Sequence, residues 1–459
     1  MEQRAAHRCA CRRQGPQTRA QRAGVVPLVW LFLAIVLACV PLLAGGCAPP
    51  PGSTTSTSTT TLASVTTATP PPSNVKPGEP ETTTTSAGPQ VIKIGALFPL
   101  TGDLAAEGQS ALKGMRLAVA EVNESGGIAA LNGALLTLDE ADSKGDARGA
   151  QAEVARLVQT DGVTAIVGTG QSTVALEATD AAERLEVPFV VSSGAADEIT
   201  GRGLAYTFRL CPQADWYARD QVAFLGTLKG LAGLDVTTVA LLHENGEFGS
   251  QTAKSERAYL ADAGIEVVAD IEYSPQQADL HSEILAIKQS GAQAILTATL
   301  LGDAAFMVQD AALQHMSVPI IDAAGGVLAP SFIADAGDSA EMTMSVAEFA
   351  AGTAPSASLE QKAAGSGTAL DADMLYAYQA VWALADALQR VGSTEGPRLR
   401  LGLATTALYG EHLVLPQSLL TFDGTGQNRG ARLLVVQVQS GRMVTVWPKE
   451  YAQGAVRLP

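Results

Sequence analysis

The residues with the most distinctive types and spacing lie in two short turns, each directly after an apolar run. Residues 168–173 read GTGQST and residues 192–197 read SSGAAD. A glycine-rich turn that begins a helix exposes unpaired backbone N–H groups at the positive end of the helix dipole, which favours an anion. Ser172 adds a hydroxyl group there, although this serine could instead serve only as the helix N-cap. Two such turns at neighbouring strand ends would line one crevice, where open α/β sheets bind ligands.

Patterns typical of catalysis or metal binding are missing from the sequence. There is no G-x-S-x-G nucleophile motif, and the five histidines show no metal-ligand spacing. The first turn is close to a dinucleotide fingerprint, but it lacks the third glycine and does not stand in the first strand–helix unit. Residues 422–428 (FDGTGQN) faintly suggest a calcium loop, but a hairpin turn is favoured. We therefore expect no enzyme activity, no cofactor and no bound metal.

The charge of the chain argues against nucleic acid as a partner. The formal net charge is −16, and aromatic residues make up only 5% of the sequence. Binding to phosphates needs a basic stripe, and stacking on bases needs exposed aromatic rings. The chain of 459 residues is also too long for one hydrophobic core, which indicates two or more units.

The N-terminus has the organisation of an export signal. Residues 1–46 contain six arginines and one acidic residue, and an apolar run extends from Val25 to Leu43. Ala44, Gly45 and Gly46 then precede Cys47, which resembles a bacterial lipobox and predicts lipidation of Cys47. The alternative is an uncleaved membrane anchor, because the apolar run is nearly long enough to span a bilayer. Either interpretation places the rest of the chain outside the membrane.

The segment after the signal predicts a stalk. Residues 47–90 are mostly Thr, Ser and Pro and cannot bury enough apolar surface to offset the entropy of ordering. The signal would remove three cysteines and the lipid would occupy Cys47, so only Cys211 remains in the body. One thiol cannot form an internal disulfide, and we expect Cys211 to be a packed small hydrophobic residue.

Beyond residue 90, apolar strand-like runs alternate with amphipathic helical stretches. This alternation predicts parallel strands joined by helical crossovers, in two separate series. The expected strands of the first series are 91–98, 134–140, 163–168 and 187–192, and those of the second are 238–242, 265–271, 292–300 and 318–321. The remainder contains a long expected helix, 371–390, and β-rich runs at 342–349, 419–422, 433–438 and 443–447. It is too short for a third domain, so we expect it to complete the other two.

Several short landmarks occur in a characteristic order along these units. They are Ile92-Lys93-Ile94-Gly95, Pro99-Leu100-Thr101-Gly102, Gly126-Gly127-Ile128, Val187-Pro188, Glu247-Phe248-Gly249, Tyr378-Gln379-Ala380-Val381 and the run from Leu420 to Gly426. In this order the chain from Val91 to about Trp447 resembles the branched-chain amino-acid-binding (leucine-binding type) periplasmic binding proteins of ABC transporters. The resemblance implies an α/β fold with two doubly wound parallel-sheet lobes joined by three crossovers, the type I clamshell. Lobe 1 would comprise residues 91–210 and 346–418, and lobe 2 residues 211–345 and 419–459, with crossovers near 210–212, 342–347 and 415–420.

The resemblance also implies a ligand site between the lobes. A serine at the position of Ser172 and the turn at 194–196 would hold the carboxylate and ammonium of an amino acid, with an acid at or near Ala324 pairing with the ammonium. Side chains at the positions of Glu107, Phe248 and Leu300 would enclose the rest of the ligand. The candidate ligand-binding residues are Glu107, Ser172, Thr173, Gly194, Ala195, Ala196, Phe248, Leu300 and Ala324.

This sequence departs from the family pattern at the ammonium end of the site. Ser172 and the aromatic Phe248 are kept, but the hydroxyl expected at Ala196 is absent and Ala324 carries no charge. Glu107 or Asp197 could substitute for the missing acid.

The resemblance predicts an extracytoplasmic, monomeric solute-binding lipoprotein of an ABC importer. It would bind a small amino-acid-like, amide or carboxylate ligand, with ABC permease subunits as protein partners and the cell membrane reached through the lipid on Cys47. The alternative is a ligand-sensing ectodomain that works with a separate signalling partner.

Overall fold

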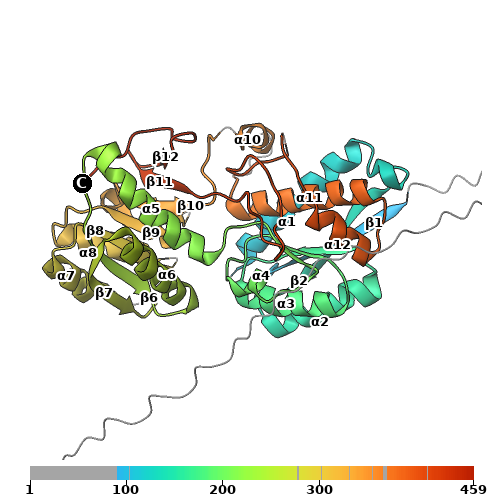
Figure 1. Ribbon diagram of the computed structural model, residues 1–459, viewed down its shortest axis with the longest axis horizontal. Coiled ribbons are helices and arrows are strands. Elements are labelled where there is room, and N and C mark those ends of the chain that lie inside the picture. Colours follow the sequence, from blue (N-terminus) through green and yellow to red (C-terminus); the bar gives the residue numbers. More distant parts are fainter. Residues whose placement is uncertain are drawn as a thin grey trace, which may run out of the picture. The chain divides into compact units, whose positions relative to one another are not determined.

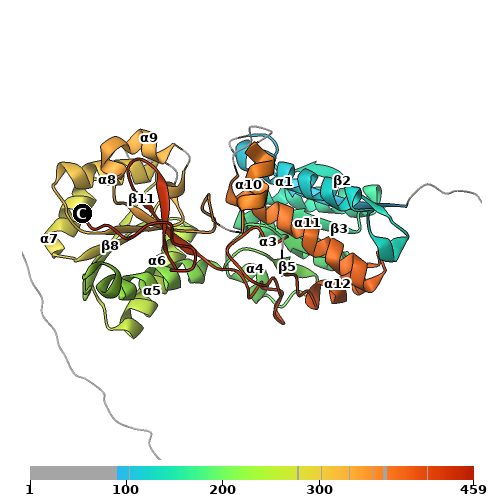
Figure 2. The same ribbon diagram turned by 90° about the horizontal axis from the view of Figure 1, so that it is seen from above.

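Two β-sheets, each covered by helices, make up the computed structural model of this chain (Figures 1 and 2). The structure describes residues 90–459, except 103, 276–278, 301, 330, 354, 365–369 and 411. The predicted signal, Cys47 and, apart from Gln90, the predicted stalk lie outside the described residues. No helix in the described part of the chain has the length and apolar character needed to cross a bilayer.

The first sheet has five strands in the order β2-β1-β3-β4-β5, and all neighbours are parallel. Its strands are β1 (Val91–Phe98), β2 (Leu135–Asp142), β3 (Ala165–Gly168), β4 (Phe189–Val191) and β5 (Thr207–Arg209). The helices of this lobe are α1 (Ala105–Glu124), α2 (Ala147–Arg156), α3 (Ser172–Arg184), α4 (Glu198–Gly201), α10 (Ala357–Ala364), α11 (Ala372–Val391) and α12 (Gly396–Ala404). Buried side chains pack on both faces of the sheet, with α1 and α11 on one face and α2 and α3 on the other. Burial on both faces explains why β1, β3 and β4 are largely apolar, whereas the edge strand β2 also carries exposed polar residues.

The second sheet has seven strands in the order β12-β11-β10-β9-β8-β6-β7. Its strands are β6 (Thr238–Glu244), β7 (Glu266–Tyr273), β8 (Ala294–Ala298), β9 (Ile320–Ala323), β10 (Met344–Ala347), β11 (Leu434–Val438) and β12 (Met443–Trp447). The helices that cover it are α5 (Ala214–Ala232), α6 (Glu247–Ala263), α7 (His281–Ser290), α8 (Asp303–Leu313) and α9 (Phe332–Ala336). Strands β6 to β10 are parallel, whereas β11 and β12 add to the edge in antiparallel orientation. The C-terminal strands therefore complete a sheet that the middle of the chain begins.

Helices α1 and α11 are distant in sequence but lie side by side (Figures 1 and 2). Gly114 permits this approach, because a Cβ atom at that position would stand 2.1 Å from the carbonyl oxygen of Met374. The side chain of Asp371 caps α11 by accepting a hydrogen bond of 2.9 Å from the backbone N–H of Met374. These contacts fix the first turn of α11, which carries Asp373.

The chain passes between the lobes at places that differ in part from the prediction. The first crossing lies between Arg209 and Ala214, as expected. The second follows β10, so Val346 and Ala347, which the sequence analysis gave to lobe 1, belong to a strand of the second sheet. The third comes after Phe422, because Leu420 and Phe422 pack in the core of the first lobe.

The predicted strand at 419–422 is wrong in its extent. Only isolated bridges form there, Leu408 with Leu420 and Phe422 with Asn428. The turn between Phe422 and Asn428 is nevertheless a hairpin turn, since the carboxylate of Asp423 accepts bonds from the backbone N–H groups of Thr425 and Gln427 at 2.8 and 3.2 Å. This segment returns to β5, where Gln427 forms a parallel bridge with Arg209.

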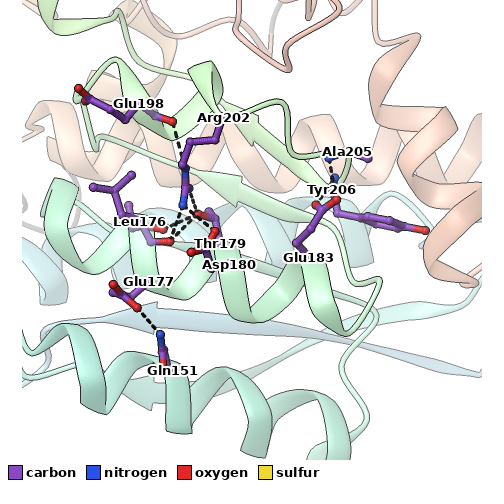
Figure 3. A network of polar contacts seen from close by, with 11 residues as sticks. Gln151, Leu176, Glu177, Thr179, Asp180, Glu183, Glu198, Arg202, Ala205 and Tyr206 are labelled. Atoms are coloured by element: carbon purple, nitrogen blue, oxygen red, sulfur yellow. Dashed lines mark hydrogen bonds and ion pairs between the residues drawn. The ribbon is translucent and has the colours of Figure 1, made fainter.

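A polar network joins α3 to the segment between α4 and β5 (Figure 3). The guanidinium of Arg202 donates to the carbonyl of Leu176, the carboxylate of Asp180 and the hydroxyl of Thr179 at 3.1, 2.7 and 2.6 Å. The carboxylate of Glu183 accepts from the backbone N–H groups of Ala205 and Tyr206 at 2.9 and 2.8 Å. The network ties the body of α3 to the segment before β5, so that the first turn of α3 has a fixed place at the end of the sheet.

Candidate functional site

A cavity of about 320 Å³ lies between the two lobes and is lined by residues of both. Its volume is at the lower end of the range typical of small-molecule sites. The lining residues follow the carboxyl ends of parallel strands or belong to the helices that start there. This is the position at which open α/β sheets bind ligands. Another cavity, of about 310 Å³, is lined by side chains of α1 and α11 such as Tyr378 and Trp382, and is not built from strand ends.

The first lobe contributes residues from α1 and the position before it, from the turns after β3 and β4, and from the start of α11. These residues are Leu104, Glu107, Gly170, Gln171, Ser193, Ala195 and Asp373. The hydroxyl of Ser193 donates to the carboxylate of Asp373 at 2.7 Å, and the amide nitrogen of Gln171 donates to the carboxylate of Glu107 at 3.3 Å. Neutral donors therefore hold both carboxylates of this wall.

The second lobe contributes Tyr217, Phe248 and Ala324, and the crossing segment directly after β10 contributes Glu348. Tyr217 on α5 donates its hydroxyl hydrogen bond to the carboxylate of Glu348, which directly follows β10. Phe248 stands in the first turn of α6 and presents an aromatic ring. Ala324, just after β9, has a left-handed backbone with φ +56°, an uncommon conformation for a residue with a Cβ atom and one that is found at ligand sites.

Burial raises the pKa of each carboxyl group that lines the cavity. Removal from water raises the pKa of Glu348 to about 7, and the negative charge of Asp373 adds to the effect. Burial likewise raises the pKa of Asp373 to about 7, with added repulsion from Asp371 and Glu107, although the bond from Ser193 opposes the shift. The pKa of Glu107 is also raised, first by burial. Among the described residues that line the cavity there is no Lys, Arg or His, so no basic side chain of the lining compensates these charges.

Residues 91–442, more than half of the chain, match the periplasmic binding protein family. The chain belongs to the periplasmic binding protein family. This result confirms the resemblance noted in the sequence and places the protein outside the cytoplasm as a ligand-binding protein, not an enzyme. The interlobe cavity is therefore the candidate ligand site of this periplasmic binding protein.

Relatives of this periplasmic binding protein carry the names of Leu/Ile/Val-binding protein homologs. The Leu/Ile/Val-binding protein homolog 7 of Brucella suis biovar 1 is 29% identical over 381 residues, which cover 80% of this chain and 94% of the relative. The Leu/Ile/Val-binding protein homolog 8 of Brucella abortus is 28% identical over 388 residues, which cover 80% of this chain and 93% of the relative.

Solved structures show the same fold with different ligands. The branched-chain amino-acid-binding protein LivJ of Streptococcus pneumoniae, in complex with isoleucine, has a TM-score of 0.66 and 23% identity, and covers 77% of this chain and 98% of its own. A solute-binding protein of R. palustris, in complex with benzoate, has a TM-score of 0.62 and 18% identity, with coverage of 78% and 95%. These likenesses confirm the type I fold of two α/β lobes. They do not select a ligand, because one fold holds an amino acid in one protein and an aromatic carboxylate in the other.

Four of the nine predicted ligand-binding residues line the cavity of this periplasmic binding protein. They are Glu107, Ala195, Phe248 and Ala324. Ser172, Thr173, Gly194 and Ala196 stand beside the cavity in the two predicted turns but are not part of its lining, and Leu300 is 38% exposed and also outside it. Asp197, the second substitute considered for the ammonium site, does not line the cavity either; its carboxylate accepts a bond of 3.4 Å from the backbone N–H of Asp215.

Ser172 supports the site indirectly. Its hydroxyl accepts a hydrogen bond of 3.0 Å from the backbone N–H of Ala196, which joins the two predicted turns. The N-cap of α3 is Gln171, so the interpretation of Ser172 as the cap residue is wrong by one position. Ser172 thus holds in place the turn whose Ala195 lines the cavity.

The acid nearest to Ala324 in sequence, Asp322, does not face the ligand site. It is fully buried, and its carboxylate accepts bonds from the hydroxyls of Thr297 and Thr299 at 2.7 and 2.9 Å and from the backbone N–H of Gly325 at 3.0 Å. Its carboxylate oxygens hold the turn after β9, so Asp322 is not a candidate acid of the ligand site.

Sequence reasoning missed Glu348 and Asp373 as candidates. Asp373 stands in the run DAD at the start of a long helix, where an acidic residue is expected for reasons of capping and helix dipole. Glu348 directly follows a strand, as do the polar residues of the two turns, and this position was the signal that could have identified it.

Proposed function

We propose that this protein is the solute-binding lipoprotein of an ABC importer and holds a small amino-acid-like solute in the interlobe cavity. The observation that carries the proposal is the cavity itself, in which hydrogen-bonding groups and an aromatic ring from both lobes converge at the strand ends. The names of the Brucella relatives support an amino-acid-like ligand. The Ala-Gly-Gly-Cys sequence ending at Cys47 supports the lipid anchor.

The ligand part of the proposal is tested by calorimetry on the full chain, purified in mild detergent. The panel contains the common amino acids, their amides, small carboxylates and small diamines. At least one compound of the panel should bind with a micromolar or lower dissociation constant, which corresponds to about −8 kcal/mol or better. A panel in which no compound binds would contradict the proposal.

The anchor part of the proposal is tested by the substitution Cys47→Ser. We expect lipid labelling and membrane retention to be lost in a bacterial host, because the cysteine sulfur is the expected attachment atom. Cys39→Ser is the matched control, since this cysteine lies within the apolar run and should be removed with the signal. Labelling that persists in the Cys47→Ser protein would show that another site carries the lipid.

A further inference from the structure

Three carboxylates from three different elements face the interlobe cavity. Glu107 belongs to α1, Asp373 to α11 and Glu348 to the crossing segment directly after β10, so three separate parts of the chain bring acids to one cavity. The direct partners of these carboxylates are the hydroxyls of Ser193 and Tyr217 and the amide of Gln171, none of which carries charge. The acids lie in the cavity where the proposed function puts the ligand, and they are not part of a solvated surface patch.

The described lining holds three acids and no basic side chain, so a ligand with no net charge leaves the ionised acids without a partner of opposite charge. An amino acid with an apolar side chain brings one ammonium and one carboxylate, which leaves the charge of the cavity unchanged. Enclosure of the ligand removes water from these groups, and buried charges without partners are costly. A ligand with two cationic groups would pair with more than one of these acids, Glu348 of the crossing segment and Asp373 or Glu107 of the first lobe.

The remaining lining fits the carbon chain of such a ligand. The rings of Phe248 and Tyr217 stand on the wall of the second lobe, and Leu104 stands on the wall of the first. Aromatic faces attract cationic groups and also pack against the methylene stem of a long basic side chain. The neighbouring Ala324 adds no charge to the lining.

We infer that the ligand of this protein is a small solute with two ammonium-type groups, either an amino acid with a basic side chain or a diamine. The inference rests on the proposed function and specifies the ligand class of the same cavity.

Affinity for such a ligand should rise with pH, because the acids must be ionised to pair with it. Burial raises the pKa of Glu348 and of Asp373 to about 7, so a fraction of each is protonated in the free protein at and below that pH, and burial raises the pKa of Glu107 as well. The titratable groups that influence one another here are Glu107, Cys211, Tyr217, Glu348, Asp371, Asp373 and Tyr376. Burial raises the pKa of the Cys211 thiol and of the two tyrosine hydroxyls, which stay neutral across this range.

The test compares three ligands of similar length by calorimetry on the full chain at about pH 8. L-lysine has both cationic groups and a carboxylate, cadaverine has the two cationic groups only, and L-norleucine lacks the side-chain ammonium. Lysine or cadaverine should bind at least ~30-fold more tightly than norleucine, because a buried acid left unpaired is costly. Whichever of lysine and cadaverine binds more tightly shows whether the ligand class is a basic amino acid or a diamine. If norleucine binds as tightly as lysine and cadaverine, the inference is overturned and the proposed function stands. If no compound of either panel binds, the inference and the proposed function are both overturned.

Site variants give the second readout. Glu348→Gln and Asp373→Asn should each weaken binding of the preferred cation by at least ~10-fold and flatten its pH dependence between about pH 5.5 and pH 8. Glu266→Gln is the matched control, because Glu266 is an exposed acid at the start of β7 outside the cavity. Unchanged affinity in both site variants would also overturn the inference.

Discussion

Glu256 on α6 shows how strongly single buried acids are perturbed in this protein. It is only 1% exposed, and its Oε1 atom has no hydrogen-bond partner among the described residues. Burial raises its pKa to about 8, with a further contribution from the charge of Asp322, while Arg257 acts in the opposite direction. Glu256 is therefore mostly protonated at neutral pH and does not act as a charged group in the core.

The titration of Glu256 predicts a pH dependence of stability. Its pKa is higher in the folded chain than in the unfolded chain, so the folded state binds more protons between about pH 4.5 and about pH 8. The free energy of unfolding should fall as pH rises through this window. Glu256→Gln keeps the shape of the side chain and replaces the ionisable carboxyl group with a neutral amide. Relative to wild type, it should therefore stabilise the protein by roughly 1–3 kcal/mol more at about pH 8.5 than at about pH 5. Urea unfolding at both pH values measures this difference, with Glu266→Gln as the exposed control. An equal effect of Glu256→Gln at both pH values would contradict the raised pKa of Glu256 in the folded protein.

Ser172 is the second residue whose role can be isolated. Its hydroxyl is the acceptor for the buried backbone N–H of Ala196. Ser172→Ala should cost about 1 kcal/mol of stability and also weaken ligand binding, because Ala195 of the same turn lines the cavity. Thr173→Ala is the control, since Thr173 is exposed and outside the cavity. Thermal unfolding and calorimetry measure both effects, and wild-type values for Ser172→Ala would show that the bond between the turns is unimportant.

At the scale of elements, one buried arginine joins the ligand-site turn to the last crossover. Arg209 on β5 is fully buried and donates to the carbonyls of Ala195 and Ala196 at 2.9 and 2.5 Å, and to the side-chain carbonyl of Gln427 at 2.6 Å. Gln427 in turn donates to the carbonyl of Cys211 at 2.9 Å. The turn after β4, the end of β5 and the segment that leads to β11 are thus one polar unit.

This arrangement predicts a large loss of stability for Arg209→Met. The substitution keeps the length of the side chain but leaves several buried acceptors without donors, each at a cost of about 1 kcal/mol or more, so we expect roughly 3–5 kcal/mol in total. Arg202→Met is the comparison, because Arg202 makes a similar number of bonds in the network around α3 (Figure 3) with a side chain that is 25% exposed. It should cost about 1 kcal/mol. Equal losses for both variants in urea unfolding would contradict the special role of Arg209.

At the scale of the whole molecule, the ligand site is incomplete in either lobe alone. Glu107 and Asp373 belong to the first lobe, whereas Phe248 and Ala324 belong to the second. Three chain segments connect the lobes, and Cys211, the one cysteine in the described part of the chain, is free, so no disulfide constrains them there. A ligand that contacts both walls binds one arrangement of the lobes better than others and shifts the population towards it.

We therefore expect ligand binding to bring the lobes together. Small-angle scattering of the full chain should show a smaller radius of gyration with saturating L-lysine than without it. The double variant Glu348→Gln, Asp373→Asn is the control and should show little change at the same lysine concentration. An unchanged profile for the wild-type protein under conditions where calorimetry shows saturation would exclude closure.

Much of the architecture could be predicted from the sequence because it is encoded locally. Apolar runs of strand length alternate with amphipathic helical stretches, and the long helix expected at 371–390 is α11, Ala372–Val391. The family landmarks occur in order along the same residues and were confirmed by the match over 91–442. The glycine- and serine-rich turns after β3 and β4 were recognisable because strand ends of parallel sheets form one edge. The predictions for the signal, for Cys47 and for most of the stalk rest on the sequence alone.

The tertiary structure decided which of these residues face the ligand cavity. Ser172 has the residue type of a ligand contact, yet its hydroxyl is occupied by Ala196, a residue 24 positions away. Asp373 is separated from Ser193 by 180 residues and Tyr217 from Glu348 by 131, so no local pattern relates these pairs. Their acids acquire raised pKa values only when packing removes water and brings like charges together. Sequence determines which groups are available, but long-range packing determines which of them are desolvated and directed into the same space.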